Sequence, residues 1–446
     1  MKKIIIIVIL LFAMLQIVNA QIITTIAGDS VVGYNGDGIL AINAELNGPY
    51  DVAVDVNGNL YIADFNNSRI RKVTISTGMI STIVGTGTAG YNGDGILAIN
   101  AELNHPRSII LDSSGNIYIS DVVNRRIRKI TISTGLISTL AGTGVAGYNG
   151  DGILADTAQL NYPNAIALDA SGNIYIADKL SERIRKIDVS TGLISTIAGT
   201  GTAGYNGDGI SAITAQLALP SGIAVDSSGN VYISDNASRI RKITISTGLI
   251  STIAGNGISG YNGDGVATSS EINYPSELSV DNSGNIYISD VGNNRIRKLN
   301  VSTGMLSTIA GTGVYNYNGD GILAINANIG CTGVTIDTAN NVYIADAGNS
   351  RIRKINMNTG ISDISYSYNS VKVYPNPSSN NITFRLSSFT QHETLLITDI
   401  FGRVVYKENI RANDTQVAVS NWKSGVYFYS LTQGEGAAIR GKFIKE

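Results

Sequence analysis

The sequence predicts an all-β chain made of six stacked repeats, followed by a small strand-rich domain. An apolar run that ends in Tyr-Ile-Ala-Asp or Tyr-Ile-Ser-Asp keeps step with the motif Tyr-Asn-Gly-Asp-Gly; both occur six times, and the second recurs at steps of 56 or 57 residues. The second motif begins at Tyr34, Tyr91, Tyr148, Tyr205, Tyr261 and Tyr317. Self-similarity at such a period is typical of units that stack and bury one another's faces.

Length and composition predict a globular chain with more than one domain. The sequence has 446 residues, of which 43% are hydrophobic and 15% are charged. Glycine is frequent, with 50 residues, and proline is rare, with 7, which favours many tight turns between short strands. The chain holds enough apolar residues to build a large core.

Residues 1–20 have the three parts of a secretory signal peptide. Lys2 and Lys3 precede an unbroken apolar run over residues 4–15, and Val18-Asn19-Ala20 resembles a cleavage site. The run is shorter than the roughly 20 residues of a membrane-spanning helix, although an uncleaved anchor is the alternative. We therefore expect the signal peptide to be removed and the mature chain to have no membrane span.

Each repeat is expected to form four short strands. In the second repeat the apolar runs cover residues 108–112, 116–120, 127–132 and 136–141, with turn residues between them. The first two runs are joined by a hairpin turn that has Gly115 where a positive φ is needed. The sixth repeat has Asn340 there, the other residue that tolerates this conformation, so a turn is favoured over a calcium loop.

An aspartate and an arginine recur at the two ends of the next hairpin, as Asp121 and Arg126 in the second repeat. The carboxylate and the guanidinium are expected to meet there and to hold the hairpin. Arg-Ile-Arg-Lys, which starts at this arginine, also recurs six times. The net charge of −2 argues against the basic surface of a nucleic-acid-binding protein, so no nucleic-acid partner is predicted.

The order of motifs within a repeat resembles the NHL repeat. In the second repeat the sequence runs Gly-Asp-Gly, Ala-Glu-Leu-Asn-His-Pro, Ile-Ile-Leu-Asp, Gly-Asn-Ile-Tyr-Ile-Ser-Asp and Asn-Arg-Arg-Ile-Arg-Lys. Six concordant copies extend over residues 22 to about 360. NHL repeats build β-propellers, so the resemblance implies a six-bladed β-propeller at residues 21–364, followed by a linker at 365–370.

The two ends of this region predict how the ring closes. Variants of Ile-Ser-Thr-Ile-Ala-Gly, the fourth strand of a repeat, follow the first five repeats, but the sixth copy at 361–365 is degraded. An additional copy stands at 23–28, before the first repeat. The N-terminal segment is therefore expected to supply the outer strand of the sixth blade and to remove an open sheet edge.

From Val371 the sequence no longer follows the repeat. Strand-like segments at 381–384, 422–428 and 442–445 predict a small antiparallel β-sandwich at 371–446. With Pro375-Asn-Pro377, their order resembles the C-terminal sorting domain of type IX secretion cargo in Bacteroidetes. The resemblance implies a route through the periplasm, contact with the type IX secretion machinery, and release or attachment at the outer-membrane surface. An accessory ligand-binding sandwich is the alternative.

Residue counts argue against common catalytic chemistries, and no catalytic residue is assigned. The two histidines, His105 and His392, lie in different predicted domains, which excludes a histidine-rich zinc site. The single cysteine, Cys331, stands where the other repeats have proline, which favours a small apolar filler over a reactive thiol. No metal and no other cofactor is predicted.

The loop that carries Tyr-Asn-Gly-Asp-Gly is long for a connection without structure. In the second repeat it covers residues 85–106, longer than the roughly 12 to 15 residues above which such loops become uncommon. Packing of its apolar tail between blades, cation binding by its aspartates and direct contact with a partner remain open. The aspartates are Asp37, Asp94, Asp151, Asp208, Asp264 and Asp320.

The ligand-binding site is predicted from the positions at which the repeats differ. The two residues after the proline position and the one before it vary among the six copies, although the surrounding frame is constant. Residues that only hold a blade together should be alike in every copy, whereas a ligand site needs different groups that converge on one axis. The alternative is that these exposed positions vary because nothing constrains them. The predicted site is a polar mouth at the channel entrance formed by Asp51, Arg107, Asn164 and Glu277, with Tyr162 and Tyr274 as stacking platforms.

The sequence therefore predicts an exported or surface-attached propeller that binds a protein or glycan ligand without catalysis. The alternative is a hydrolase that resembles gluconolactonases and paraoxonases. In that interpretation Asp51, Asn164 and Glu277, from three different blades, hold an axial metal ion.

Overall fold

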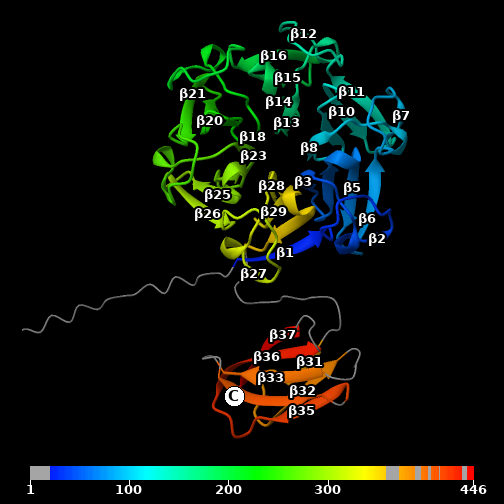
Figure 1. The fold of residues 1–446 in the computed structure, drawn as a ribbon, viewed down its shortest axis with the longest axis vertical. Coiled ribbons are helices and arrows are strands. Elements are labelled where there is room, and N and C mark those ends of the chain that lie inside the picture. Colours follow the sequence, from blue (N-terminus) through cyan, green and yellow to red (C-terminus); the bar gives the residue numbers. More distant parts are fainter. Residues whose placement is uncertain (1–20, 358–370, 387–392, 400–402, 411, 434–438) are drawn as a thin grey trace, which may run out of the picture. The chain divides into compact units, whose positions relative to one another are not determined.

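The computed structural model describes residues 21–357, 371–386, 393–399, 403–410, 412–433 and 439–446. They belong to two compact units that divide after Asn358. The first unit is a ring of six sheets around a central axis (Figure 1). The predicted signal peptide and linker lie outside the described residues. Within the described ranges, no helix is long and apolar enough to cross a membrane.

Each sheet is one blade, and its first four strands run outward from the axis in antiparallel order. The innermost strands are β3 (Pro49–Val54), β8 (Pro106–Leu111), β13 (Pro163–Leu168), β18 (Ile223–Val225), β23 (Pro275–Val280) and β28 (Gly333–Ile336). The second strands are β4 (Leu60–Asp64), β9 (Ile117–Asp121), β14 (Ile174–Asp178), β19 (Val231–Asp235), β24 (Ile286–Asp290) and β29 (Val342–Asp346). The third strands are β5 (Arg69–Thr74), β10 (Arg126–Thr131), β15 (Arg183–Ile187), β20 (Arg239–Thr244), β25 (Arg295–Asn300) and β30 (Arg351–Ile355). The fourth strands are β6 (Met79–Val84), β11 (Leu136–Ala141), β16 (Leu193–Ala198), β21 (Leu249–Ala254), β26 (Met305–Ala310) and β1 (Ile22–Ala27).

A fifth, outermost strand in each blade is absent from the sequence prediction. It is a two-residue segment of the long loop that pairs antiparallel with the fourth strand, as Ile96 does with Ile137. These strands are β2 (Ile39–Leu40), β7 (Ile96–Leu97), β12 (Ile153–Leu154), β17 (Ile210–Ser211), β22 (Gly265–Val266) and β27 (Ile322–Leu323). Two residues are too few to show a hydrophobic period, which is why the pattern does not reveal them.

Short 3-10 turns occur at two places in the repeat, after the outermost strand and after the second strand. One set comes directly after the outermost strand and comprises η1 (Ala41–Asn43), η3 (Ala98–Asn100), η4 (Ala155–Thr157), η6 (Ala212–Thr214), η7 (Ala267–Ser269) and η9 (Ala324–Asn326). The other follows the second strand in four blades and comprises η2 (Phe65–Asn67), η5 (Lys179–Ser181), η8 (Val291–Asn293) and η10 (Ala347–Asn349).

The ring closes as predicted, through the N-terminal strand. β1 pairs antiparallel with β30, with Ile23 opposite Ile355, and it also carries the outermost strand β27. Ala27 at its end packs in a core cluster with Ala345 of the sixth blade and Val52 of the first. The degraded copy at 361–365 lies outside the described residues.

The core of the propeller lies between neighbouring blades. The cluster between the first and second blades joins Tyr61 and Ile70 to Ile117 and Ile130. The tail of the long loop enters the same cluster, because Ala98, Ala101 and Leu103 are buried there. The packing interpretation of the loop tail is therefore confirmed, and each blade needs its neighbour to bury its face.

The hairpins between the first and second strands have the predicted turn. Asp112 accepts hydrogen bonds from the backbone N–H groups of Ser114 and Asn116 at 2.9 Å. Gly115 has a φ of 81°, and Asn340 at the same position of the sixth blade has a φ of 64°. The aspartate oxygens accept hydrogen bonds within the turn, which agrees with a hairpin turn rather than a calcium loop.

The second unit is a small sandwich of two antiparallel sheets. Aromatic residues Phe384, Tyr427, Tyr429 and Phe443 form much of its buried core. One sheet has the order β31 (Val371–Tyr374), β32 (Asn381–Leu386), β35 (Asp414–Ala418). The other has the order β34 (Val404–Asn409), β33 (Glu393–Thr398), β36 (Gly425–Gln433), β37 (Ile439–Lys445). The all-β prediction of a six-bladed propeller followed by a small β domain is thus confirmed.

Closure by β1 predicts that deletion of residues 22–27 lowers the melting temperature and causes aggregation, because the edge of β30 becomes exposed. A point variant gives a sharper measure. Ile23→Ala removes a fully buried side chain and should lower the free energy of unfolding by about 2–5 kcal/mol in chemical denaturation. Thr24→Ala, its half-buried neighbour on the same strand, should cost less than about 1 kcal/mol. An unchanged melting temperature of the deletion variant would contradict the closure.

Candidate functional site

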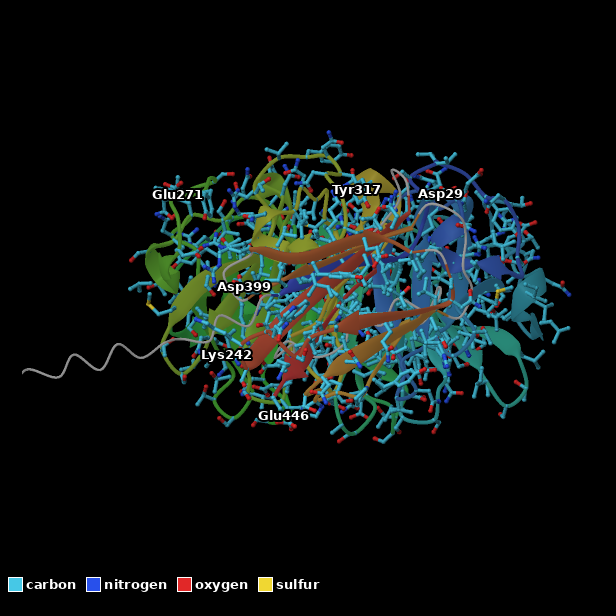
Figure 2. All side chains as sticks on the ribbon, turned by 90° about the horizontal axis from the view of Figure 1, so that it is seen from below. Asp29, Lys242, Glu271, Tyr317, Asp399 and Glu446 are labelled. Atoms are coloured by element: carbon cyan, nitrogen blue, oxygen red, sulfur yellow. The ribbon has the colours of Figure 1, made fainter. Side chains whose placement is uncertain are left out.

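The long loops lie on one side of the propeller. Figure 2, which shows the ring edge-on, places Asp29, Glu271 and Tyr317, from the loops of three repeats, along the same edge. Each loop leaves a fourth strand and leads into an innermost strand, and the antiparallel order puts both of these ends on this side. The hairpin after the second strand opens on the same side. We call this side the loop face.

Each loop is held to its own blade by the residues of its motif. Asp94 Oδ1 accepts hydrogen bonds from Arg128 Nη2 at 3.0 Å and from Thr139 Oγ1 at 3.1 Å. Its Oδ2 accepts one from Tyr91 OH at 3.2 Å. Both carboxylate oxygens are therefore engaged by the blade, which supports packing over cation binding.

The predicted pair of Asp121 and Arg126 does not form, and this expectation is corrected. The two residues lie opposite each other in the strands, but Arg126 donates to the backbone carbonyls of Asn124 and Thr143. Arg128, two residues further, is fully buried and places Nη1 3.6 Å from Asp121 Oδ2. The Tyr91 ring lies against both guanidinium groups, at 3.8 and 4.8 Å, and Asn124 donates to Asp121, so the first arginine is held away from the carboxylate.

The innermost strands of all six blades surround the axis (Figure 1). Their residues line a cavity of about 430 Å³. Most of its lining residues have apolar side chains, such as Ile166, Ile223 and Val334, but the surface that faces the cavity is more polar than apolar. Asp51, Ser108 and Glu277 line it at the second residue after the proline position, near the loop face. The channel therefore has carboxyl and hydroxyl groups where its strands begin.

Asp51 and Glu277 are two buried carboxyl groups in this ring, exposed by only 5% and 9%. Asp51 accepts hydrogen bonds from the backbone N–H groups of Val52 at 2.8 Å and Ile109 at 3.0 Å, so it also links the first two blades. Burial raises its pKa to about 6. Burial, and then the nearby charge of Asp51, raise the pKa of Glu277 well above its ordinary value. The two groups are thus close enough to influence each other.

Arg107 brings a cation to the same place. Its side chain is 8% exposed, and its guanidinium carbon lies 4.0 Å from the centre of the Tyr50 ring. Its charge acts on both Asp51 and Glu277. These three predicted residues, from blades one, two and five, therefore converge on the axis.

An aromatic row extends outward from this cation. The Tyr50 ring lies 5.1 Å from that of Phe65, which in turn meets His105 edge-on at 4.7 Å. The row crosses from the first blade to the second. It gives the mouth one apolar wall beside its charged groups.

Lys179 is the second cation at the mouth. It is the first residue after Asp178, in the hairpin on the loop face, and its backbone N–H donates to the carbonyl of Tyr162. Burial, and then the charge of Arg107, lower its pKa to about 8. The lysine and the arginine therefore lie near each other on neighbouring blades.

The other predicted residues are less closely joined to this group. Asn164 is fully buried, and its Nδ2 donates to the Ser221 carbonyl at 2.7 Å, while Oδ1 has no hydrogen-bond partner. Tyr274 is 63% exposed and Tyr162 is half-buried. Within the described part of the chain, neither tyrosine ring contacts another ring or a cation, so their stacking role stays a prediction.

Sequence reasoning missed Lys179, Tyr50 and Phe65, although the signal was present. Lys179 and Phe65 occupy the position directly after the buried aspartate of the second strand. That position varies among the repeats, with five residue types in six copies: Phe65, Val122, Lys179, Asn236, Val291 and Ala347. Tyr50 belongs to the variable pair after the proline position but was not chosen, because only residues with charged or amide groups were selected there.

The residues proposed for an axial metal do not fit a divalent cation well. Asp51 already accepts two backbone hydrogen bonds, and the guanidinium of Arg107 lies close enough to act on both carboxyl groups. A resident cation beside an uncompensated guanidinium would be repelled. Asn164 Oδ1 has no hydrogen-bond partner, but this side chain is fully buried and is not among the residues that line the cavity. Among the described residues, no three His, Cys, Asp or Glu side chains are grouped as a metal site.

Family comparisons match both parts of the chain. NHL repeats are found at residues 46–73, 273–299 and 329–355, and the teneurin NHL domain matches residues 144–206 and 201–259. Residues 372–446 match the secretion system C-terminal sorting domain. These matches agree with the predicted resemblances.

Relatives of known name match the repeat region. SUPPRESSOR OF QUENCHING 1 of Arabidopsis thaliana, a chloroplastic protein, is 30% identical over 325 residues, which are 70% of this chain and 30% of that protein. Teneurin-3 of Mus musculus is 29% identical over 300 residues, 58% of this chain and 11% of that protein. NHL repeat-containing protein 2 of Bos taurus is 25% identical over 353 residues, covering 70% and 47%. The chain spans less than half the length of each.

Two solved structures from Bacteroides thetaiotaomicron share the fold. An auxiliary nutrient binding protein aligns with a TM-score of 0.56 at 20% identity and covers 75% of this chain and 76% of its own. A structural genomics protein aligns with a TM-score of 0.56 at 21% identity and covers 76% of both chains. At this identity the likeness shows the fold alone.

The buried carboxyl pair predicts a pH-dependent gain from Glu277→Gln. The raised pKa of Glu277 means that the folded state binds this proton more tightly than the unfolded state does. The resulting stability is present below the unfolded pKa of about 4.3 and is lost as the pH rises through the raised value. Glutamine does not titrate, so the stability of the variant relative to the parent should increase in denaturant titrations as the pH rises above about 4.3. Parallel pH profiles of the two proteins would refute the shift.

Proposed function

We propose that this chain is a binding module without catalysis. It is an NHL-repeat β-propeller that ends in a secretion system C-terminal sorting domain. The sorting domain supports export by the type IX route to the cell surface or beyond. The ligand site of the propeller is the mouth of the channel on the loop face. Asp51, Arg107, Asn164 and Glu277 carry the binding, with Tyr162 and Tyr274 at the rim. The partner is a protein or a glycan.

One observation carries this proposal. Six blades of nearly equal sequence and equal strand order place unlike groups at equivalent positions around the axis. Arg107 stands where the other blades have Tyr, Asn, Ser or Thr, and Glu277 stands where three have Gly or Ala. Charged groups that stay buried cost stability unless they serve another purpose, so their convergence supports a ligand site.

The histidine and cysteine residues support a role without catalysis. His105 packs its ring against Phe65, and its Nδ1 pairs with Asn104. Burial raises the pKa of the Cys331 thiol, which disfavours the reactive thiolate. His392 lies outside the described residues. The hydrolase alternative remains the second candidate, and the position of Arg107 beside Asp51 and Glu277 weighs against it.

The rest of the proposal concerns delivery. Residues 1–20 act as a signal peptide that takes the chain to the periplasm of a Bacteroidetes cell. The domain at 371–446 then engages the type IX secretion machinery and is the address for passage through the outer membrane. The mature protein is released or attached to the surface.

The binding part is tested once a glycan or protein array has identified a ligand. Alanine at Arg107 and Glu277 should each weaken its binding by about 1 kcal/mol or more in calorimetry, because groups buried at the centre of a site contribute most. Far-UV circular dichroism and the melting curve serve as the control for folding. Unaltered affinity in the double variant would move the site away from the mouth.

The delivery part is tested by removing residues 371–446. Cell fractionation should then find the propeller folded but retained in the periplasm, because it forms a compact unit of its own. The full-length chain is the control. Normal display or release of the truncated protein would show that these residues are not the address.

A further inference from the structure

The mouth holds two cations that have no partner. Arg107 is only 8% exposed, yet its side chain makes no hydrogen bond or ion pair with any described residue. The ammonium group of Lys179 likewise makes no hydrogen bond or ion pair within the described ranges, although the charge of Glu182 acts on it. The Arg107 nitrogens are not among the fully enclosed unpaired atoms, so its five N–H donors can be reached at the mouth. The two cations therefore offer donors to an acceptor that the described residues do not supply.

The nearby carboxyl groups do not fill this role. No oxygen of Asp51 or Glu277 lies within 4.0 Å of a nitrogen of Arg107, although every other buried arginine of the propeller has a carboxylate within that distance. Asp51 is directed to backbone N–H groups instead. Burial also raises the pKa of Glu277 well above its ordinary value, which weakens its negative charge.

Aromatic rings and a carboxyl group lie near the two cations. Tyr50 and Phe65 form an apolar wall beside Arg107. Glu277 lines the cavity, and no described side chain donates a hydrogen bond to it. The mouth thus offers cations for one anionic group, an acceptor for a hydroxyl group, and an aromatic wall on which a ring can rest.

We propose that the mouth binds the carboxylate of a sugar acid through Arg107 and Lys179. This rests on the proposed function, since it names the class of ligand at the same site. The planar carboxylate matches the guanidinium fork, and the ammonium group of Lys179 supplies the second contact. A hydroxyl group of the sugar donates to Glu277, and the sugar ring packs on Phe65.

A sugar acid fits these groups better than other anions. Inorganic phosphate carries more negative charge but offers few hydroxyl donors for the acceptor, and its second charge would be repelled by the carboxyl groups below. An acidic peptide brings a carboxylate but no ring of hydroxyl groups. The combination of cations with an acceptor is what favours the hydroxylated acid.

The test compares probes that differ in one group. Calorimetry at low salt with the full chain from Gln21 uses methyl glucuronide and methyl glucoside, which differ only by a carboxylate in place of a hydroxymethyl group. Inorganic phosphate and N-acetylaspartate represent the other anions. The expected result is that methyl glucuronide binds at least about tenfold more tightly than each of the other probes.

The variants are taken from equivalent positions of the other repeats, so that each has a precedent in the fold. Arg107→Ser copies Ser221, and Lys179→Ala copies Ala347. Each should weaken glucuronide binding by about tenfold or more. Arg125→Ser, which copies Ser68 and removes a charge from the same face, should leave it unchanged. Melting curves of the three variants report whether each is folded.

Four results would overturn the inference. Equal binding of glucuronide and glucoside, both weakened by Arg107→Ser, would keep the site but remove the anion. Equal or tighter binding of phosphate or N-acetylaspartate would replace the sugar acid with another anion. Glucuronide binding that neither variant weakens would place the acid elsewhere. No binding of any probe would reject the sugar acid, while the array experiment decides separately whether the mouth binds another ligand.

Discussion

A fully buried guanidinium in the third strand of each blade is the interaction on which the propeller depends. Arg128 donates to the Gly93 carbonyl at 2.9 Å and to Asp94, and it faces Asp121. One group therefore ties the long loop and the hairpin aspartate to its own blade. A buried cation that loses its partners costs several kcal/mol, so the loop, the hairpin and the strand must form together. The six arginines are Arg71, Arg128, Arg185, Arg241, Arg297 and Arg353. The uniform sequence of the loops follows from this requirement.

A frame that is held by contacts within each repeat leaves the axis free to vary. The contacts of Asp94 and Arg128 use no residue near the channel, and their equivalents recur in the other blades. Substitutions at the mouth therefore leave these contacts in place. The chemistry of Arg107, Lys179 and Glu277 can differ from repeat to repeat while the architecture stays the same. A function of such a protein is accordingly sought where the repeats disagree.

The sequence predicted what depends on period and missed what depends on side-chain direction. The 56- or 57-residue step gave six blades, and the additional copy at 23–28 gave the closing strand. The predicted partner of Asp121 was wrong, because spacing along a hairpin does not tell which of two arginines on one strand face turns inward. Asp51, Arg107 and Glu277 were found by divergence between repeats and do converge. Lys179 escaped because the same comparison was not applied to the hairpin after the second strand.

Steric crowding at the axis limits which blades can carry a side chain at the mouth. The second residue after the proline position is Gly222 in the fourth blade and Gly333 in the sixth. A Cβ on Gly333 would lie 3.0 Å from the Cα of Asp51, and one on Gly222 would lie 2.9 Å from the Cα of Glu277. Both distances are shorter than ordinary van der Waals contact, so these two positions must stay small beside the carboxyl residues. In a closely packed ring, a large side chain in one blade therefore depends on a small one in the next, and the two glycines are as much a part of the mouth as Asp51 and Glu277.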